Sequence, residues 1–202
     1  MQPQLILASA SPRRHELLLQ IGVPHHICTA DIDESAQPNE SPQALVQRLA
    51  LAKARPIWQQ REQVGELALP VLGADTLGSL DGELLIKPRD FAHAQQMLCA
   101  MSGQQHDIFS AVAVCHAQGE AVVCNHSRVW FREISDAEIS AYWASGEPQD
   151  KAGAYAIQGL GAVFVERLEG SYSAVMGLPL FETAQLLQRV GLHTGLKHDL
   201  YL

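Results

Sequence analysis

Two long segments with strand-type patterns, residues 106–116 and 121–134, follow one another with only a short turn around Gly119 between them. Runs of alternating or continuous apolar residues of this kind are typical of β-strands. Strands joined by so short a turn run antiparallel, because parallel neighbours need a long crossover. Helix-type and strand-type segments alternate in the rest of the chain. The sequence therefore predicts an α/β fold with a mixed sheet of about six strands, flanked by helices.

Capping residues mark where the helices begin. Ser41 and Asp90 each precede a run with apolar residues at helical spacing. Ser135 and Glu138 have the spacing of a capping box. Pro56 is expected to disturb or end the helix that contains it, because proline has no backbone N–H to donate. We expect helices to begin at Ser11, Ser41, Asp90, Ser135 and Pro179.

Residues 69–90 predict a buried strand, then a loop, then a hairpin that turns at Asp81 and Gly82. Residues 161–170 predict another strand. Because no internal repeat or low-complexity linker interrupts the chain, we expect a single domain over 1–202. A break near residues 85–105 would divide it into two lobes with a cleft between them. The polar tail from about His193 is expected to be disordered or frayed.

The chain is acidic, with 14 Lys and Arg against 22 Asp and Glu and a formal net charge of −8. This charge, without any basic tract, disfavours stable binding to nucleic acid or a membrane surface. No apolar run reaches membrane-spanning length and no signal-peptide pattern is present, so a cytoplasmic location is expected. The 4 cysteines show neither CxxC nor metal-ligand spacing, and we expect them to be reduced and mostly buried.

Arg13 and Arg14 fall in the first turn of the helix that Ser11 and Pro12 begin. The helix macrodipole is positive at that end, so two cations are unfavourable there unless an anion is bound. Free N–H groups at a helix start attract anions, and guanidinium groups pair with phosphate oxygens through two hydrogen bonds. The pattern indicates a phosphate site. The alternative is a pair of solvated arginines, which contribute little.

Acidic side chains occur at two places suited to a hard cation. Asp75 directly follows an apolar strand segment, and strand ends are where open α/β sheets bind ligands. Asp31, Asp33 and Glu34 cluster in a loop, and clustered carboxylates can hold Mg²⁺ together with substrate phosphates. The structural alternatives are a turn residue at Asp75 and a solvated loop around Glu34.

Three further side chains have both a functional and a structural interpretation. Lys53 and Lys87 are either phosphate ligands or surface lysines. Gln158 either reads a base edge with one donor and one acceptor or satisfies the loop backbone. The 9 histidines show no metal-binding spacing, and His106 is expected to be structural or exposed. The chain also lacks a GxSxG serine site, a P-loop and a dinucleotide fingerprint.

Several of these motifs together resemble the Maf proteins, a family of nucleoside triphosphate pyrophosphatases. The motifs are ASASPRR, DIDE, LALAKA, GADT, KPRD, SGQQHDIFSA, SGEPQDKAGAYAIQGLGA and GLPLFET, spread from about Leu5 to Leu187. The resemblance implies hydrolysis between the α- and β-phosphates, with a divalent cation such as Mg²⁺ or Mn²⁺. It also implies a mixed α/β fold with a long curved sheet, a cleft between two lobes, and members that are often dimers.

The resemblance also implies roles for matched residues. Asp75 resembles the catalytic acid and would lie at the metal with Glu34. Thr76 and Gln158 resemble the branch that acts on dTTP and UTP, since a glutamine amide complements a pyrimidine carbonyl and N–H. Arg13 would contribute to substrate specificity as well as to phosphate binding. The implied phosphate-binding set is Ser9, Arg13, Arg14, Lys53 and Lys87.

Two other functions stay open on the sequence alone. One is a nucleotide-binding regulator of septum formation with little turnover. The other is a pyrophosphatase for 7-methylguanosine triphosphate, but that branch has Gln after the catalytic Asp and Glu in place of Gln158. The chain departs from the family pattern at Gly78, Ser79, Ser110 and Ala174. Modified pyrimidine nucleotides are possible substrates beside the canonical ones.

Overall fold

A seven-stranded mixed sheet forms the centre of the structure, a computed structural model that describes residues 2–65 and 69–195. The strand order is β2-β1-β3-β5-β6-β7, and β4 pairs with β3 beside this path. β1 is parallel to β2 and β3, and the other pairs are antiparallel, so the predicted mixed sheet is confirmed. The strands are β1 (Leu5–Leu7), β2 (His25–Ile27), β3 (Val71–Leu80), β4 (Glu83–Leu85), β5 (Gln105–His116), β6 (Gly119–Phe131) and β7 (Val165–Glu169).

β3 is longer than its sequence predicts. The expected loop after the buried strand is absent from the described chain, because β3 pairs with β5 continuously from Val71 to Ser79. Pairing with a long neighbour outweighs the weak strand preference of the glycines in this segment. The hairpin at Asp81 and Gly82 is confirmed, with φ values of 51° and 87° that suit a tight turn.

The helices are α1 (Pro12–Gln20), α2 (Pro42–Gln63), α3 (Phe91–Met101), α4 (Asp136–Ala144), α5 (Tyr172–Met176) and α6 (Leu180–Arg189). The 3₁₀ turns are η1 (Glu147–Asp150), η2 (Ala152–Ala154) and η3 (Leu160–Phe164). The side chains of Ser41 and Asp90 accept capping hydrogen bonds, and the capping box of Ser135 is present. Ser11 occupies the N-cap of α1 without a side-chain capping bond.

Pro56 does not end its helix, which excludes the stronger of the two effects expected of it. α2 continues through it to Gln63, with Pro56 on the exposed side and Ala54 and Ile57 buried. Packing of this buried face against the sheet holds the helix across the one backbone hydrogen bond that proline cannot make.

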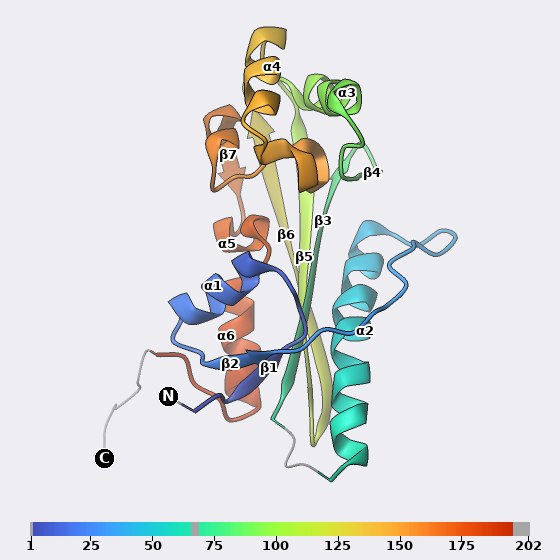
Figure 1. Ribbon diagram of the computed structural model, residues 1–202, viewed down its shortest axis with the longest axis vertical. Helices are drawn as coiled ribbons and strands as arrows, with labels where there is room; N and C mark the ends of the chain where they lie inside the picture. The colour runs from blue at the N-terminus through green and yellow to red at the C-terminus, as the bar shows by residue number, and fades with distance from the viewer. Residues whose placement is uncertain (1, 66–68, 196–202) are drawn as a thin grey trace.

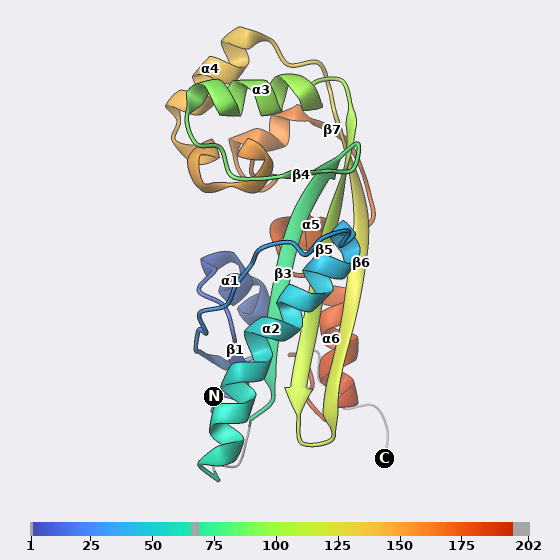
Figure 2. The same ribbon diagram turned by 90° about the vertical axis from the view of Figure 1, so that its right-hand side faces the viewer.

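Helices cover both faces of the sheet (Figure 1). α2 packs on one face, where Val46 and Ala50 meet Ala111 and Ala113 of β5. α1 and α6 pack on the other face, through a cluster that includes Leu17, Leu18, Leu186 and Leu187. The long strands β3, β5 and β6 curve as they pass between these layers (Figure 2).

α2 comes unusually close to β3 at Gly73. A Cβ atom there would lie 2.1 Å from the carbonyl oxygen of Ala50, so only glycine fits. Residues two apart on a strand and three apart on a helix share a face. The close approach therefore brings Lys53, one turn beyond Ala50, towards Asp75, two residues beyond Gly73.

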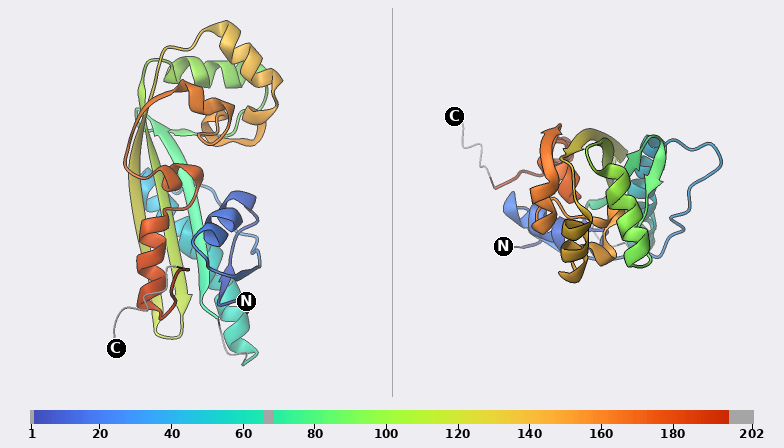
Figure 3. Two further views of the ribbon diagram at one scale, coloured as in Figure 1. Left: turned by 90° about the vertical axis from the view of Figure 1, so that its left-hand side faces the viewer. Right: turned by 90° about the horizontal axis from the view of Figure 1, so that it is seen from above.

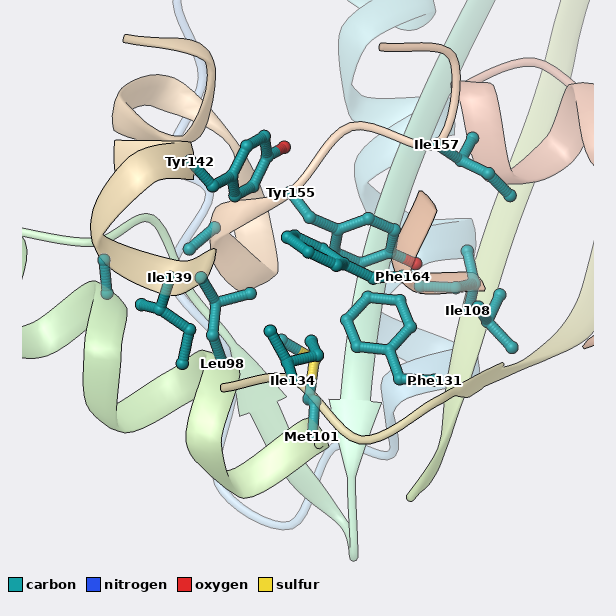
Figure 4. Packing of buried hydrophobic residues seen from close by; sticks show 13 residues of the cluster. Leu98, Met101, Ile108, Phe131, Ile134, Ile139, Tyr142, Tyr155, Ile157 and Phe164 are labelled. Atoms are coloured by element: carbon teal, nitrogen blue, oxygen red, sulfur yellow. The ribbon is translucent and has the colours of Figure 1, made fainter. Parts of the chain in front are cut away.

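β4, β7, α3, α4 and η1–η3 gather at one end of the long strands and are called the upper lobe here. Its core is a cluster that includes Leu98, Phe131, Tyr142, Tyr155 and Phe164 (Figure 4). Two lobes are present, but residues 85–105 do not separate them. The boundary instead crosses β3, β5 and β6, which run through both lobes (Figure 1).

Three smaller expectations need correction or completion. Residues 161–164 lie in the 3₁₀ turn η3, and only Val165–Glu169 form the predicted strand. Cys28 and Cys99 are exposed, so the cysteines are not mostly buried. The expected tail is described as far as Gly195, whose N–H donates to the Ile21 carbonyl at 2.7 Å, and residues 196–202 lie outside the described residues. In the described chain, no helix combines the length and apolarity needed to span a membrane.

Candidate active site

A cavity of about 320 Å³ lies between α1, the middle of β3 and the segment of the upper lobe that leads to Gln158. Figure 3 shows α1 and the upper lobe on the same side of the long strands. Several side chains predicted for the site come together here from distant parts of the chain. The predicted residues in the cavity wall are Arg13, Arg14, Thr76, Lys87 and Gln158.

The charged side chains of this wall are mostly cationic. Arg13, Arg14, Lys87 and Lys151 face a single acid, Asp150, among the described lining residues. Asp150 is itself paired with Lys151, and that hydrogen bond, with the nearby charge of Arg13, lowers the pKa of its carboxyl. An excess of cations over anions in a concave site favours a polyanionic ligand.

Arg14 is held in place by two acceptors. Its Nε donates to the carbonyl of Gly177 at 2.9 Å, and its NH1 donates to Ser9 Oγ at 3.2 Å. Ser9 is buried and does not line the cavity, so its contact with the cavity is through Arg14. Arg13 makes no side-chain hydrogen bond or ion pair within the described chain, which leaves its guanidinium available to a ligand.

Thr76 shares an acceptor with Arg14. Its Oγ1 lies 2.7 Å from Ser110 Oγ and donates to the same Gly177 carbonyl at 3.3 Å. Ser110 is one of the departures from the family pattern, and its hydroxyl still reaches Thr76. The Gly177 carbonyl therefore joins the arginine of α1 to the threonine of β3.

Asp75 lies on the opposite face of β3 from Thr76, as adjacent strand residues do. The buried Asp75 carboxylate accepts from Lys53 Nζ at 2.6 Å. The same Nζ lies 2.7 Å from Glu34 Oε1, whose side chain is exposed. These three residues form a group beside the cavity and outside its lining. Lys53, predicted as a phosphate ligand, is thus paired with both acids predicted to hold the metal.

The group of Glu34, Lys53 and Asp75 is near enough to the cavity to interact electrostatically with Arg14 in its wall, and the middle of β3 between them has an uncovered edge. β1 pairs with β3 only at residues 71 and 72, and β4 begins its pairing at Gly78. Between these points no described strand covers this side of β3. Burial lowers the pKa of Arg14, while the charges of Asp75 and Glu34 act to raise it. Arg14 therefore couples electrostatically to the acids as well as to the cavity.

The donor set fits a hard divalent cation. Two carboxylate oxygens, from Glu34 and Asp75, converge on one point, where they now meet the Lys53 ammonium. The described residues contain no group of three or more His, Cys, Asp or Glu that could hold a metal. Two carboxylates suffice for Mg²⁺ or Mn²⁺ where waters and substrate phosphates complete the coordination. Asp33 instead accepts from the Ser35 N–H at 2.9 Å.

Sequence reasoning missed Asp150, Lys151 and Tyr155 in the cavity wall. The signal was present, because all three lie in the DKAGAY motif. Backbone strain marks the same segment: the buried Ala154 has a φ of 57°, which is unfavourable for a residue other than glycine. His106, as expected, is structural; it is 1% exposed and lies 2.8 Å from the Tyr155 hydroxyl.

Comparisons with known proteins agree with the motifs. The family described as Maf-like protein matches residues 4–190. The chain is 48% identical to a dTTP/UTP pyrophosphatase of Nitrosomonas europaea, with 93% of this chain and 95% of the relative covered. It is 49% identical to a dTTP/UTP pyrophosphatase of Pseudoalteromonas atlantica, over 93% of this chain and 97% of the relative.

A dTTP/UTP pyrophosphatase of Alkalilimnicola ehrlichii is 53% identical, over 92% of each chain. Among solved structures, protein VC0702 from Vibrio cholerae aligns over 72% of both chains with 9% identity and a TM-score of 0.31, too low to support an argument. The family match spans nearly the whole chain, including the residues of the cavity wall and the group of Glu34, Lys53 and Asp75. The chain belongs to the Maf family.

Proposed function

We propose that this protein hydrolyses dTTP and UTP to the nucleoside monophosphate and pyrophosphate. The observation that carries the proposal is a cationic cavity, with an exposed glutamine in its wall, beside a buried carboxylate that converges with a second acid. Relatives at 48–53% identity are named for this activity. A polyanionic substrate with a pyrimidine base matches both the charge and the hydrogen-bonding groups of the wall.

The cations of the wall would bind the triphosphate. Arg13 and Lys87 make no ion pair within the described chain, so a ligand would not have to displace a partner from either. Arg14 already points along a direction set by Ser9 and Gly177. Such preorganised charge stabilises the negative charge that develops on phosphate oxygens during displacement, without reorganisation at the moment of reaction.

Glu34 and Asp75 would hold the divalent cation, Mg²⁺ or Mn²⁺. When bound, such an ion neutralises phosphate charge and lowers the pKa of the attacking water. Lys53 would then leave the two carboxylates and become free to pair with a phosphate oxygen, as its sequence role predicts. Asp75, which resembles the catalytic acid of the family, would accept a proton on its carboxylate once Lys53 has moved.

Gln158 and Thr76 would select the base. The amide of Gln158 offers one donor and one acceptor, which complement the carbonyl and N–H of uracil or thymine. A 7-methylguanine base is cationic and would favour a carboxylate at this position. The neutral amide therefore supports the pyrimidine substrates over the methylated guanine nucleotide.

A turnover screen across canonical and modified nucleoside triphosphates, with released pyrophosphate as the readout, tests the proposal. We expect dTTP and UTP, or a modified pyrimidine nucleotide, to give the highest kcat/KM in the presence of Mg²⁺ or Mn²⁺. Asp75→Asn, which keeps an oxygen for Lys53, should fold normally and lose turnover. Preference for 7-methylguanosine triphosphate would favour that branch, and binding without turnover would favour a regulatory protein.

A homodimer, which the family resemblance implies, and a cytoplasmic location, expected from the sequence, belong to the same proposal. Sedimentation of the purified protein would decide the oligomeric state.

A further inference from the structure

The loop that carries Gln158 is attached to the rest of the upper lobe by two side chains outside the cavity. Glu147 Oε2 accepts from the Leu160 N–H at 2.8 Å, and its Oε1 accepts from the Gly161 N–H at 3.0 Å. The Tyr142 hydroxyl accepts from the Ala156 N–H at 3.1 Å. Side chains of α4 and η1 therefore hold one backbone amide before Gln158 and two after it.

The two side chains also hold each other. The Tyr142 hydroxyl donates to Glu147 Oε1 at 2.6 Å. This bond and those from the Leu160 and Gly161 amides stabilise the ionised carboxylate, so the pKa of Glu147 is lowered although burial acts to raise it. A charged acceptor makes stronger hydrogen bonds than a neutral one. The attachment is thus a connected network with both carboxylate oxygens in use.

Two glycines of the loop pack directly against this network. A Cβ atom at Gly159 would lie 2.1 Å from Glu147 Oε2, and one at Gly161 would lie 2.6 Å from the Tyr142 hydroxyl. The carboxylate and the hydroxyl therefore lie in direct contact with the backbone that follows Gln158. A loop packed this closely on charged and polar groups has little freedom to move its backbone at Gln158.

Glu147 also begins η1, the turn that leads to the cavity residues Asp150 and Lys151. One carboxylate thus connects two separate parts of the cavity wall. We propose that Glu147 is a positioning residue for base recognition, holding the Gln158 loop so that its amide faces the base in one orientation. This inference rests on the proposed function, in which Gln158 reads a pyrimidine.

Removing Glu147 should weaken binding of the base and leave binding of the phosphates unchanged. When the loop backbone is loose, the Gln158 amide occupies several positions, so selecting the one that fits the base costs affinity on binding. For Glu147→Ala we expect the KM for UTP to rise about tenfold with kcat within about twofold, a change equal to about 1.4 kcal/mol. The inhibition constant of inorganic tripolyphosphate, which has no base, should change less than about twofold.

Glu138→Gln is the matched control. Glu138 is another carboxylate of the upper lobe with several hydrogen bonds, from Arg132 and from the backbone and side chain of Ser135, and it does not line the cavity. Its variant should lower thermal stability without raising the KM for UTP. Tyr142→Phe tests the same loop independently, because it removes the hydroxyl that binds the Ala156 N–H and keeps the ring. Glu147→Asp retains a carboxylate and should restore part of the affinity that Glu147→Ala loses.

Hydrogen exchange of the backbone amides at residues 156–161 supplies a readout that needs no turnover. Glu147→Ala should speed their exchange at least about tenfold relative to Glu138→Gln. Equal loss of UTP and tripolyphosphate affinity, or unchanged exchange in this loop, would overturn the proposal. If the wild-type protein turned over neither dTTP nor UTP, the proposed function would fail, while the exchange measurement would still decide whether Glu147 holds the loop.

Discussion

Lys53 and Asp75 are joined by a contact of 2.6 Å between Nζ and Oδ1, in a place where the sequence predicts a metal ion. The same ammonium reaches Glu34 at 2.7 Å, so a single cation balances both carboxylates. An ammonium and a divalent cation that share their ligands compete for them. Lys53 therefore stabilises the two acids, and a metal ion bound by Glu34 and Asp75, as proposed, would have to displace it.

Removal of the Lys53 ammonium should make the protein more responsive to metal alone. In Lys53→Met, Glu34 and Asp75 are left without a cation, and the added ion no longer has to displace one. We expect the rise in Tm on adding Mn²⁺ to be larger than in the wild type, while kcat falls about tenfold or more because a phosphate ligand is lost. Arg55→Met, which breaks the exposed pair with Glu120, is the control on the same helix. An equal or smaller metal-induced shift would argue against competition.

Adjacent arginines of α1 should differ in their effects on stability. Arg14 donates to Ser9 and Gly177, whereas Arg13 has no side-chain partner within the described chain. Arg14→Ala should lower the free energy of unfolding by about 1–3 kcal/mol, the usual loss for hydrogen bonds to a charged group. Arg13→Ala should leave it unchanged or raise it by a few tenths of a kcal/mol, because a cation is removed from a helix start. Urea denaturation of the free proteins measures both, and the KM for UTP should rise in each.

Local signals in the sequence predicted much of the fold. The capping box of Ser135 and the turn at Asp81 were predictable because each depends on a few neighbouring residues. The continuous β3 and the helix through Pro56 were not, because both depend on packing against elements far away in the chain. Tertiary contacts routinely outweigh local preference in this way.

The sequence predicted several residues of the cavity wall, but not how the charged side chains of the candidate site pair with one another. Arg13, Thr76 and Gln158 do line one cavity. The pairing of Lys53 with Asp75 was not foreseen, because it requires the approach of α2 that Gly73 allows. A pattern of residue types shows which groups are available, but not which of them are already paired with one another.

Replacement of the Gln158 amide should separate substrate recognition from folding. Gln158→Glu leaves only acceptors at that position and removes the donor to a pyrimidine carbonyl. We expect kcat/KM for UTP to fall about tenfold to hundredfold, since an unpaired polar group in the complex costs about 1–3 kcal/mol. Gln158 is exposed, so Tm should stay nearly constant. Gln149→Glu introduces the same charge at an exposed residue outside the cavity and should leave kcat/KM unchanged. Unaltered kinetics in Gln158→Glu would remove Gln158 from the base site.

His106 should make the folded state sensitive to mild acid. Burial lowers the pKa of its imidazole to about 4, with the charge of Asp107 opposing the shift. In the unfolded chain a histidine titrates near 6.5, so between these values the unfolded state binds a proton that the native state does not. The free energy of unfolding should therefore have its full value above pH 6.5 and decrease as the pH falls towards 4, with a loss of about 2 kcal/mol by pH 5.

His106→Gln removes this titration and retains a polar group near the Tyr155 hydroxyl, which His106 now meets at 2.8 Å. Urea denaturation at pH 7 and pH 5 measures the effect as the difference between wild type and variant, which cancels the carboxylate contributions common to both. The wild type should lose about 2 kcal/mol more than the variant between the two values. Equal losses would mean that His106 is protonated in the folded protein at pH 5, and that the imidazole of the upper-lobe core is accessible to protons.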